Sequence, residues 1–98
     1  MKLRVLPSAI GDLGAGRFFY SQNGEELGDY FLDSLFADID SLAIHAGVHM
    51  QLWGFHRMLA RRFPFAIYYK VDGDVCTIWR VLDCRQSPRR VRGALLGR

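Results

Sequence analysis

The sequence predicts a single α+β domain, 1–98, in which a two-helix hairpin packs on a small, mostly antiparallel sheet of about four strands. Three observations carry this prediction. The chain has 98 residues, enough for one domain with its own core. Two amphipathic stretches of helical length follow each other, and three strand-like stretches come after them. Both sets of apolar residues are buried only if the helix hairpin lies on the sheet.

The first half of the chain predicts a short strand and two helices. Lys2 to Leu6 alternates charged and apolar residues, which is typical of an edge strand. Pro7 ends this strand, and Ser8 is a favourable helix N-cap, so a first helix is expected over Ser8 to Ser21. Asn23-Gly24 predicts a turn. The second helix, over Glu25 to Ala46, has a broad apolar arc opposite an acidic one.

The second half predicts the remaining strands. Val48 to Gly54 has no clear period and is expected to be a loop. Asp72-Gly73-Asp74 predicts a tight hairpin turn. The strands are expected over His56 to Ala60, Phe65 to Val71 and Val75 to Asp83, and a short basic helix or tail over Arg89 to Arg98.

Side-chain alternation in the last strand assigns its two faces. It places Trp79 with Val75, Thr77 and Val81, and it places Arg80 with Cys76, Ile78 and Leu82. The last two strands are almost continuously apolar, so we expect both faces of the sheet to be covered or used.

Charge divides the chain into an acidic and a basic part. The formal net charge is +3, yet no Lys or Arg occurs between Phe18 and His56. From Arg57 onward the chain is rich in arginine. The molecule is therefore expected to carry faces of opposite sign, and its basic face suits phosphates or an acidic protein.

Other site types are weakly supported by the sequence. Cys76 and Cys84 have no metal-ligand spacing, and reduced thiols fit the expected cytoplasmic location. His45 and His49 have the spacing of a helical metal pair, but Gly47 interrupts it, so no metal site is expected. No secretory signal and no membrane span are visible.

The order and residues of these elements resemble the RelE/ParE superfamily of bacterial toxins. The resemblance begins with Ala9, Asp12-Leu13 and Phe19-Tyr20, and continues with Leu27-Gly28 and Phe31. It is most specific in Arg61-Arg62-Phe63-Pro64-Phe65, Ile67-Tyr68-Tyr69 and the ending Arg80-Val81-Leu82-Asp83-Cys84-Arg85-Gln86-Ser87-Pro88.

The resemblance implies the toxin of a type II toxin–antitoxin system, of the kind linked to plasmid stabilization. It implies no cofactor, and it implies a cognate antitoxin as partner, acidic and partly disordered, with which the chain could form an oligomer. The RNA-cleaving branch carries lysines before the central strands and a late Tyr. This chain has no Lys between Lys2 and Lys70 and no Tyr after Tyr69. It is therefore more similar to the ParE branch, which inhibits DNA gyrase and is not an enzyme.

Two alternatives stay open, a ribosome-dependent mRNA endonuclease and an inactive relative that only binds its antitoxin. An endonuclease would have to use Arg80, Arg85 and His56, since no other base is evident. The residues expected to bind the target or the partner are all arginines: Arg61, Arg62, Arg80, Arg85, Arg89, Arg90 and Arg92.

Overall fold

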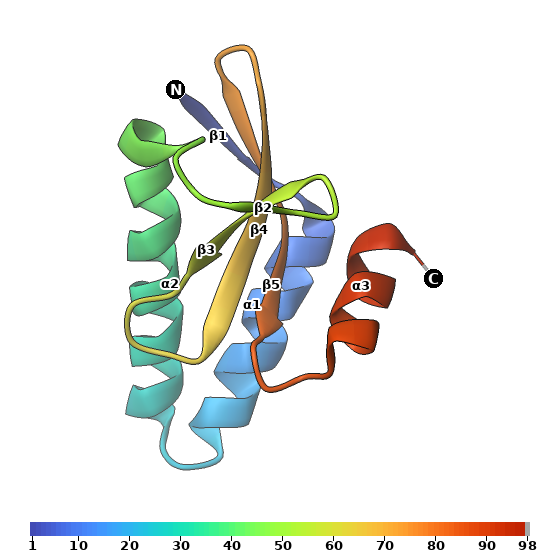
Figure 1. Ribbon diagram of the computed structural model, residues 1–98. Helices are drawn as coiled ribbons and strands as arrows, with labels where there is room; N and C mark the ends of the chain where they lie inside the picture. The colour runs from blue at the N-terminus through green and yellow to red at the C-terminus, as the bar shows by residue number, and fades with distance from the viewer. Residues whose placement is uncertain (98) are drawn as a thin grey trace.

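The computed structural model describes residues 1–97, in which three helices and one five-stranded sheet form a layered α+β domain (Figure 1). The elements are β1 (Lys2–Val5), α1 (Pro7–Ser21), α2 (Glu25–His45), β2 (Gln51–Leu52), β3 (Phe55–Leu59), β4 (Phe65–Asp72), β5 (Val75–Asp83) and α3 (Pro88–Leu96). The strand order is β1-β5-β4-β3-β2, with β1 parallel to β5 and every other pair antiparallel. The predicted fold class is confirmed.

The helix hairpin packs closely because glycine lies at its contacts. A Cβ atom on Gly16 of α1 would collide with the ring of Phe31 on α2. A Cβ atom on Gly28 would come within 2.9 Å of the backbone oxygen of Arg17. Gly11 and Gly14, in contrast, face open space. Two of the glycines that lower helix propensity therefore allow the two helices to approach each other.

The main core lies between the hairpin and the sheet. α1 and α2 contribute Leu13, Phe31, Leu35 and other apolar residues that are at most 1% exposed. Ile67 of β4 and Ile78 of β5 meet them from the sheet. Each such side chain contributes about 1.5–3 kcal/mol to folding by its burial. The apolar residues that recur at helical spacing in the sequence are thus the ones that form the core.

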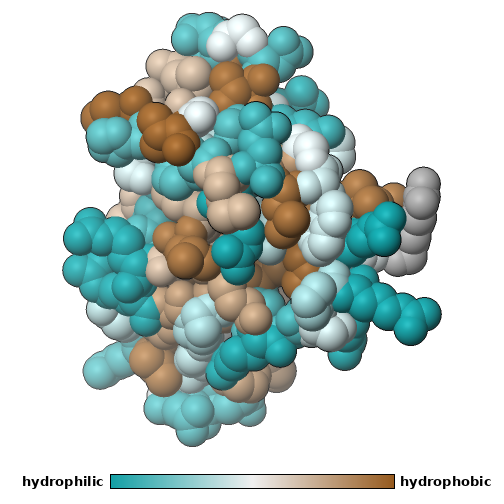
Figure 2. Space-filling view, in the orientation of Figure 1, coloured by the Kyte–Doolittle hydropathy of each residue, from teal (hydrophilic) through white to brown (hydrophobic). Residues whose placement is uncertain are grey.

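A second, smaller core lies on the opposite face of the sheet, under α3. Val91 and Leu95, one helical turn apart, are each 7% exposed and pack with Tyr68 and Leu82. The Ser87 hydroxyl caps this helix by accepting the Arg90 N–H at 3.2 Å. α3 therefore covers part of this far face. On the side of the molecule shown in Figure 2, exposed hydrophobic residues lie between hydrophilic ones.

The prediction of about four strands was one too low. The segment expected to be a loop contains β2, which pairs Leu52 with Phe55 across a two-residue turn. Trp53 and Gly54 both have positive φ, 53° and 83°, as the tightest class of hairpin turn requires. Trp is an unusual residue for that conformation, so the sequence gives no hairpin signal here.

The predicted start of the first helix was also wrong. Leu6, not Ser8, is the N-cap, and no side chain caps the helix. Pro7 occupies the first turn, where its missing N–H costs nothing. Ser8 therefore lies within the first turn of α1, and its hydroxyl hydrogen-bonds to the backbone of β5 instead of capping the helix.

A β-bulge in β5 overturns the predicted alternation of its side chains. Tyr68 pairs with Arg80 and Tyr69 with Ile78, so Trp79 is an extra residue without a partner. Beyond the bulge the faces are exchanged. Val81 therefore packs in the main core under the helix hairpin, and Leu82 packs in the smaller core under α3.

Candidate functional site

The bulge in β5 leaves backbone groups that the sheet does not pair, and α1 supplies their partners. The Ser8 hydroxyl donates to the carbonyl oxygen of Trp79 at 2.7 Å. One helical turn later, a carboxylate oxygen of Asp12 accepts the N–H of Val81 at 2.9 Å. Because unpaired backbone groups are costly, these two polar residues fix α1 against the bulge.

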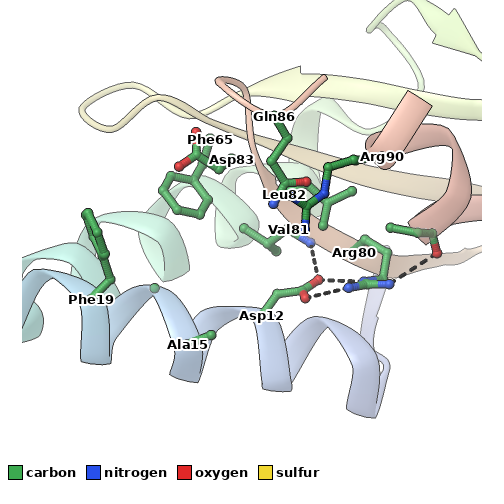
Figure 3. Close-up of a pocket in the computed structure, with 12 residues that line it drawn as sticks. Asp12, Ala15, Phe19, Phe65, Arg80, Val81, Leu82, Asp83, Gln86 and Arg90 are labelled. Carbon is green, nitrogen blue, oxygen red and sulfur yellow. Dashed lines mark hydrogen bonds and ion pairs between the residues drawn. The ribbon is translucent and has the colours of Figure 1, made fainter. Parts of the chain in front are cut away.

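Arg80 joins three elements at this point (Figure 3). Its Nε and Nη2 donate to both carboxylate oxygens of Asp12, at 2.7 and 2.8 Å, and its Nη1 donates to the carbonyl oxygen of Ala94 at 3.1 Å. Hydrogen bonding to Asp12 raises the pKa of Arg80, although partial burial opposes the shift. Arg80 therefore connects α1, β5 and α3 and stays charged.

An open cavity of about 400 Å³ lies between α1, β5 and α3. Asp12 and Arg80 lie at one end of it and Phe19 at the other (Figure 3). Asp83, Gln86 and Arg90 bring further polar groups to its wall. The cavity thus carries charges of both signs rather than a concentrated positive potential.

Arg85 is held by Asp83, which lies two residues before it in the chain. Its side chain donates to both carboxylate oxygens of Asp83, the shortest contact being 2.6 Å, and its guanidinium lies 6.0 Å from the centre of the Phe19 ring. Hydrogen bonding to Arg85 lowers the pKa of Asp83 below its usual value. The charge of Arg85 is therefore largely neutralised by Asp83.

His56 lies away from these arginines. β3 carries it, with β4 between β3 and β5. Its Nδ1 lies 2.8 Å from the carbonyl oxygen of His49, and its ring stacks on Tyr69 with 5.0 Å between ring centres. Arg80 lines the cavity, and Arg85 lies beside it through Asp83 and Phe19, which both line it, but His56 is not among the lining residues.

His49 and His56 form a separate network with Tyr69. The Tyr69 hydroxyl lies 2.5 Å from Nδ1 of His49 and accepts the N–H of Gly47 at 3.0 Å. Burial lowers the pKa of His49, and the charges of His56 and His45 lower it further. Among residues 1–97, no three His, Cys, Asp or Glu side chains are grouped so as to hold a metal ion.

The remaining arginines of the expected binding set are exposed. Arg61 and Arg62 lie in the turn between β3 and β4, where the backbone N–H of Arg61 donates to the buried carboxylate of Asp38. The others are Arg89, Arg90 and Arg92 on α3, of which Arg90 also lines the cavity. Within the described part of the chain, no side chain of these arginines forms an ion pair. Arg98 lies outside the described residues.

The sequence did not indicate that Ser8 and Asp12 both hydrogen-bond to the backbone of β5. Their spacing of four residues places them on one face of α1, which was visible. What they bond to was not visible, because the bulge that creates the unpaired groups has no signature in the sequence of β5.

Comparison with known proteins finds the same fold in a solved structure. No protein-family model and no curated protein matches the chain. A solved structure titled "Chromosomal ParDE TA system from P. aeruginosa" is similar, with a TM-score of 0.76 and 23% sequence identity. The match covers 83% of this chain and 92% of that chain. No helix within residues 1–97 is long and apolar enough to cross a membrane. The structural similarity shows that the chain shares its fold with a chain of that ParDE system, which confirms the predicted ParE-like architecture.

Proposed function

We propose that this chain is the toxin of a type II toxin–antitoxin pair and that it inhibits growth by binding DNA gyrase in the cytoplasm. The observation that carries the proposal is the fold shared with a chain of a ParDE system over 83% of the present sequence. The motifs from Arg61 to Pro88 support it independently, since they resemble the same superfamily.

The arrangement of the candidate groups favours gyrase binding over RNA cleavage. RNA cleavage without a metal requires a base for the 2′-hydroxyl and a cation free to stabilise the phosphorane. Arg80 and Arg85 are already paired with carboxylates, so among the residues that line the cavity Arg90 is the arginine without an ion pair within residues 1–97. His56 is engaged with His49 and Tyr69. A toxin without a catalytic base must act by occupying its target.

The exposed arginines are the proposed contact surface. Arg89, Arg90 and Arg92 project from α3, and Arg61 and Arg62 project from the turn between β3 and β4. They suit an acidic protein surface or the DNA that gyrase holds. In this proposal Arg80 positions α3 through its bond to Ala94, and it does not itself touch the target.

The same positive surface suits the proposed antitoxin. An acidic segment that becomes ordered on binding would neutralise the arginines of α3 and thereby block the target. Since α3 already covers the apolar residues Tyr68 and Leu82 of the far sheet face, this segment would contact α3 or the helix hairpin rather than that part of the sheet. Such a complex allows the oligomers that the resemblance implies.

Expression in a bacterial host tests the proposal against its two alternatives. Gyrase inhibition is expected to induce the SOS response, and co-expression of the antitoxin should abolish the induction. Arrest of translation with cleaved mRNA would favour the endonuclease instead. Normal growth with stable, soluble toxin would favour the inactive relative.

A further inference from the structure

A row of side chains crosses the part of the far sheet face that α3 leaves open. Arg4 of β1 pairs in register with Thr77 of β5, and Thr77 pairs with Lys70 of β4. Leu3 and Val5 pack against the main core, so Arg4 lies on the opposite face of the sheet. Two cations therefore flank a central threonine, two strand spacings apart, or roughly 10 Å between their Cα atoms.

An aromatic side chain lies directly beside this row. The ring of Trp79 is partly exposed and packs edge-on against Phe55, with 5.5 Å between ring centres. The Lys70 ammonium lies 4.5 Å from the centre of the Phe55 ring and 5.1 Å from that of Trp79. Trp79 follows Thr77 by two residues and therefore lies on the same face of β5, where it packs against the smaller core. The tryptophan is thus a platform next to a fixed cation.

These residues enclose an open depression of about 390 Å³, lined by Arg4, Leu6, Lys70, Asp72, Thr77 and Trp79. Within residues 1–97 neither Arg4 nor Lys70 takes part in an ion pair. Asp72 is the one acid among the lining residues. Lys2 lies two residues before Arg4, on the same face of β1, and adds a further positive charge.

We propose that this depression binds single-stranded nucleic acid, with a base stacked on Trp79 and a backbone phosphate between Arg4 and Lys70. Exposed aromatic rings beside cations on an open sheet are how proteins bind single strands without reading their sequence. An acidic peptide would use the cations but would gain little from Trp79. The site lies apart from the arginines of α3, and the inference does not depend on gyrase being the target.

The test measures how the purified full chain binds a fluorescent oligo(dT) strand over a range of salt concentrations. Trp79→Ala is expected to weaken binding roughly 5- to 150-fold, the loss of one stacked base. Trp79→Phe should restore most of it, since a π face is kept. Arg4→Ala is expected to reduce the slope of log affinity against log salt by about 0.7, the loss of one phosphate contact on a single strand. Arg17→Ala, an exposed arginine on α1 outside both proposed binding surfaces, is the control and should leave both quantities unchanged.

A second arm avoids any effect of substitution on folding. The unmodified protein should bind an abasic strand of the same length about as weakly as Trp79→Ala binds oligo(dT). Equal binding of the abasic strand, or loss of binding in Arg17→Ala but not in Arg4→Ala, would overturn the proposal. So would a poly-glutamate peptide that binds more tightly than oligo(dT), because the depression would then be a protein-binding site.

Discussion

Arg80→Ala is the substitution that this structure predicts to be most damaging among the arginines. The substitution removes two hydrogen bonds to Asp12 and one to the carbonyl oxygen of Ala94. It leaves the Asp12 carboxylate with the N–H of Val81 as its remaining partner. The side chains of Arg80 and Asp12 are only 27% and 14% exposed, so water replaces these bonds poorly.

The size of the effect follows from this partial burial. Exposed ion pairs contribute about 0.2–1 kcal/mol, and breaking a fully buried pair costs about 3–5 kcal/mol. The Asp12–Arg80 pair lies between these limits, so we expect a loss of about 2–3 kcal/mol in the free energy of unfolding. For a domain of this size that loss lowers Tm by about 8–24 °C.

Urea and thermal unfolding measure the loss, with Arg85→Ala as the matched control. Arg85 also binds a carboxylate in bidentate fashion, but its partner is two residues away and its side chain is 56% exposed. Its removal should leave Tm close to that of the wild type. If Arg80→Ala lowers Tm no more than Arg85→Ala does, Arg80 does not hold α3, α1 and β5 together.

Two further predictions concern the hairpin and the histidine network. Gly16→Ala should destabilise the protein by about 1–3 kcal/mol in urea unfolding, because the new Cβ meets the packed ring of Phe31, whereas Gly14→Ala, in open space, should stabilise it by up to about 1 kcal/mol. Equal effects of the two substitutions would contradict the proposed close contact. Because the pKa of His49 is lowered in the folded protein, the unfolded chain takes up its proton first as the pH drops below about 6.5. The free energy of unfolding should therefore decrease over that range, and His49→Gln should flatten the decrease; identical pH profiles for the two proteins would refute this origin.

The regular elements could be predicted from the sequence because each follows from a local pattern. α2 has the expected start, since Glu25 follows the Asn23-Gly24 turn, and it ends one residue before the predicted Ala46. β5 spans Val75 to Asp83 as predicted. Burial of an apolar arc or strand dictates these elements, and the sequence displays that burial directly.

The features that shape the site depend on contacts between distant segments. The Trp79 bulge is stabilised by Ser8, 71 positions away, and by the Asp12 bond to Val81. The role of Arg80 as a connection follows from the bulge, because Arg80 reaches Asp12 from that irregular part of the strand. No local period reports such contacts, so this connecting role of Arg80 could not be predicted from the sequence.

The most direct test of the central claim is a supercoiling assay in which purified gyrase is titrated with this protein. We expect inhibition that saturates near an equimolar ratio, because a toxin without a catalytic base acts by occupying its target. Arg89→Glu/Arg92→Glu, which reverses two exposed and unpaired charges on α3, should abolish inhibition, while Arg17→Ala on the hairpin should retain it. Unimpaired gyrase at an equimolar ratio, together with cleavage of mRNA on ribosomes by the same preparation, would contradict the claim.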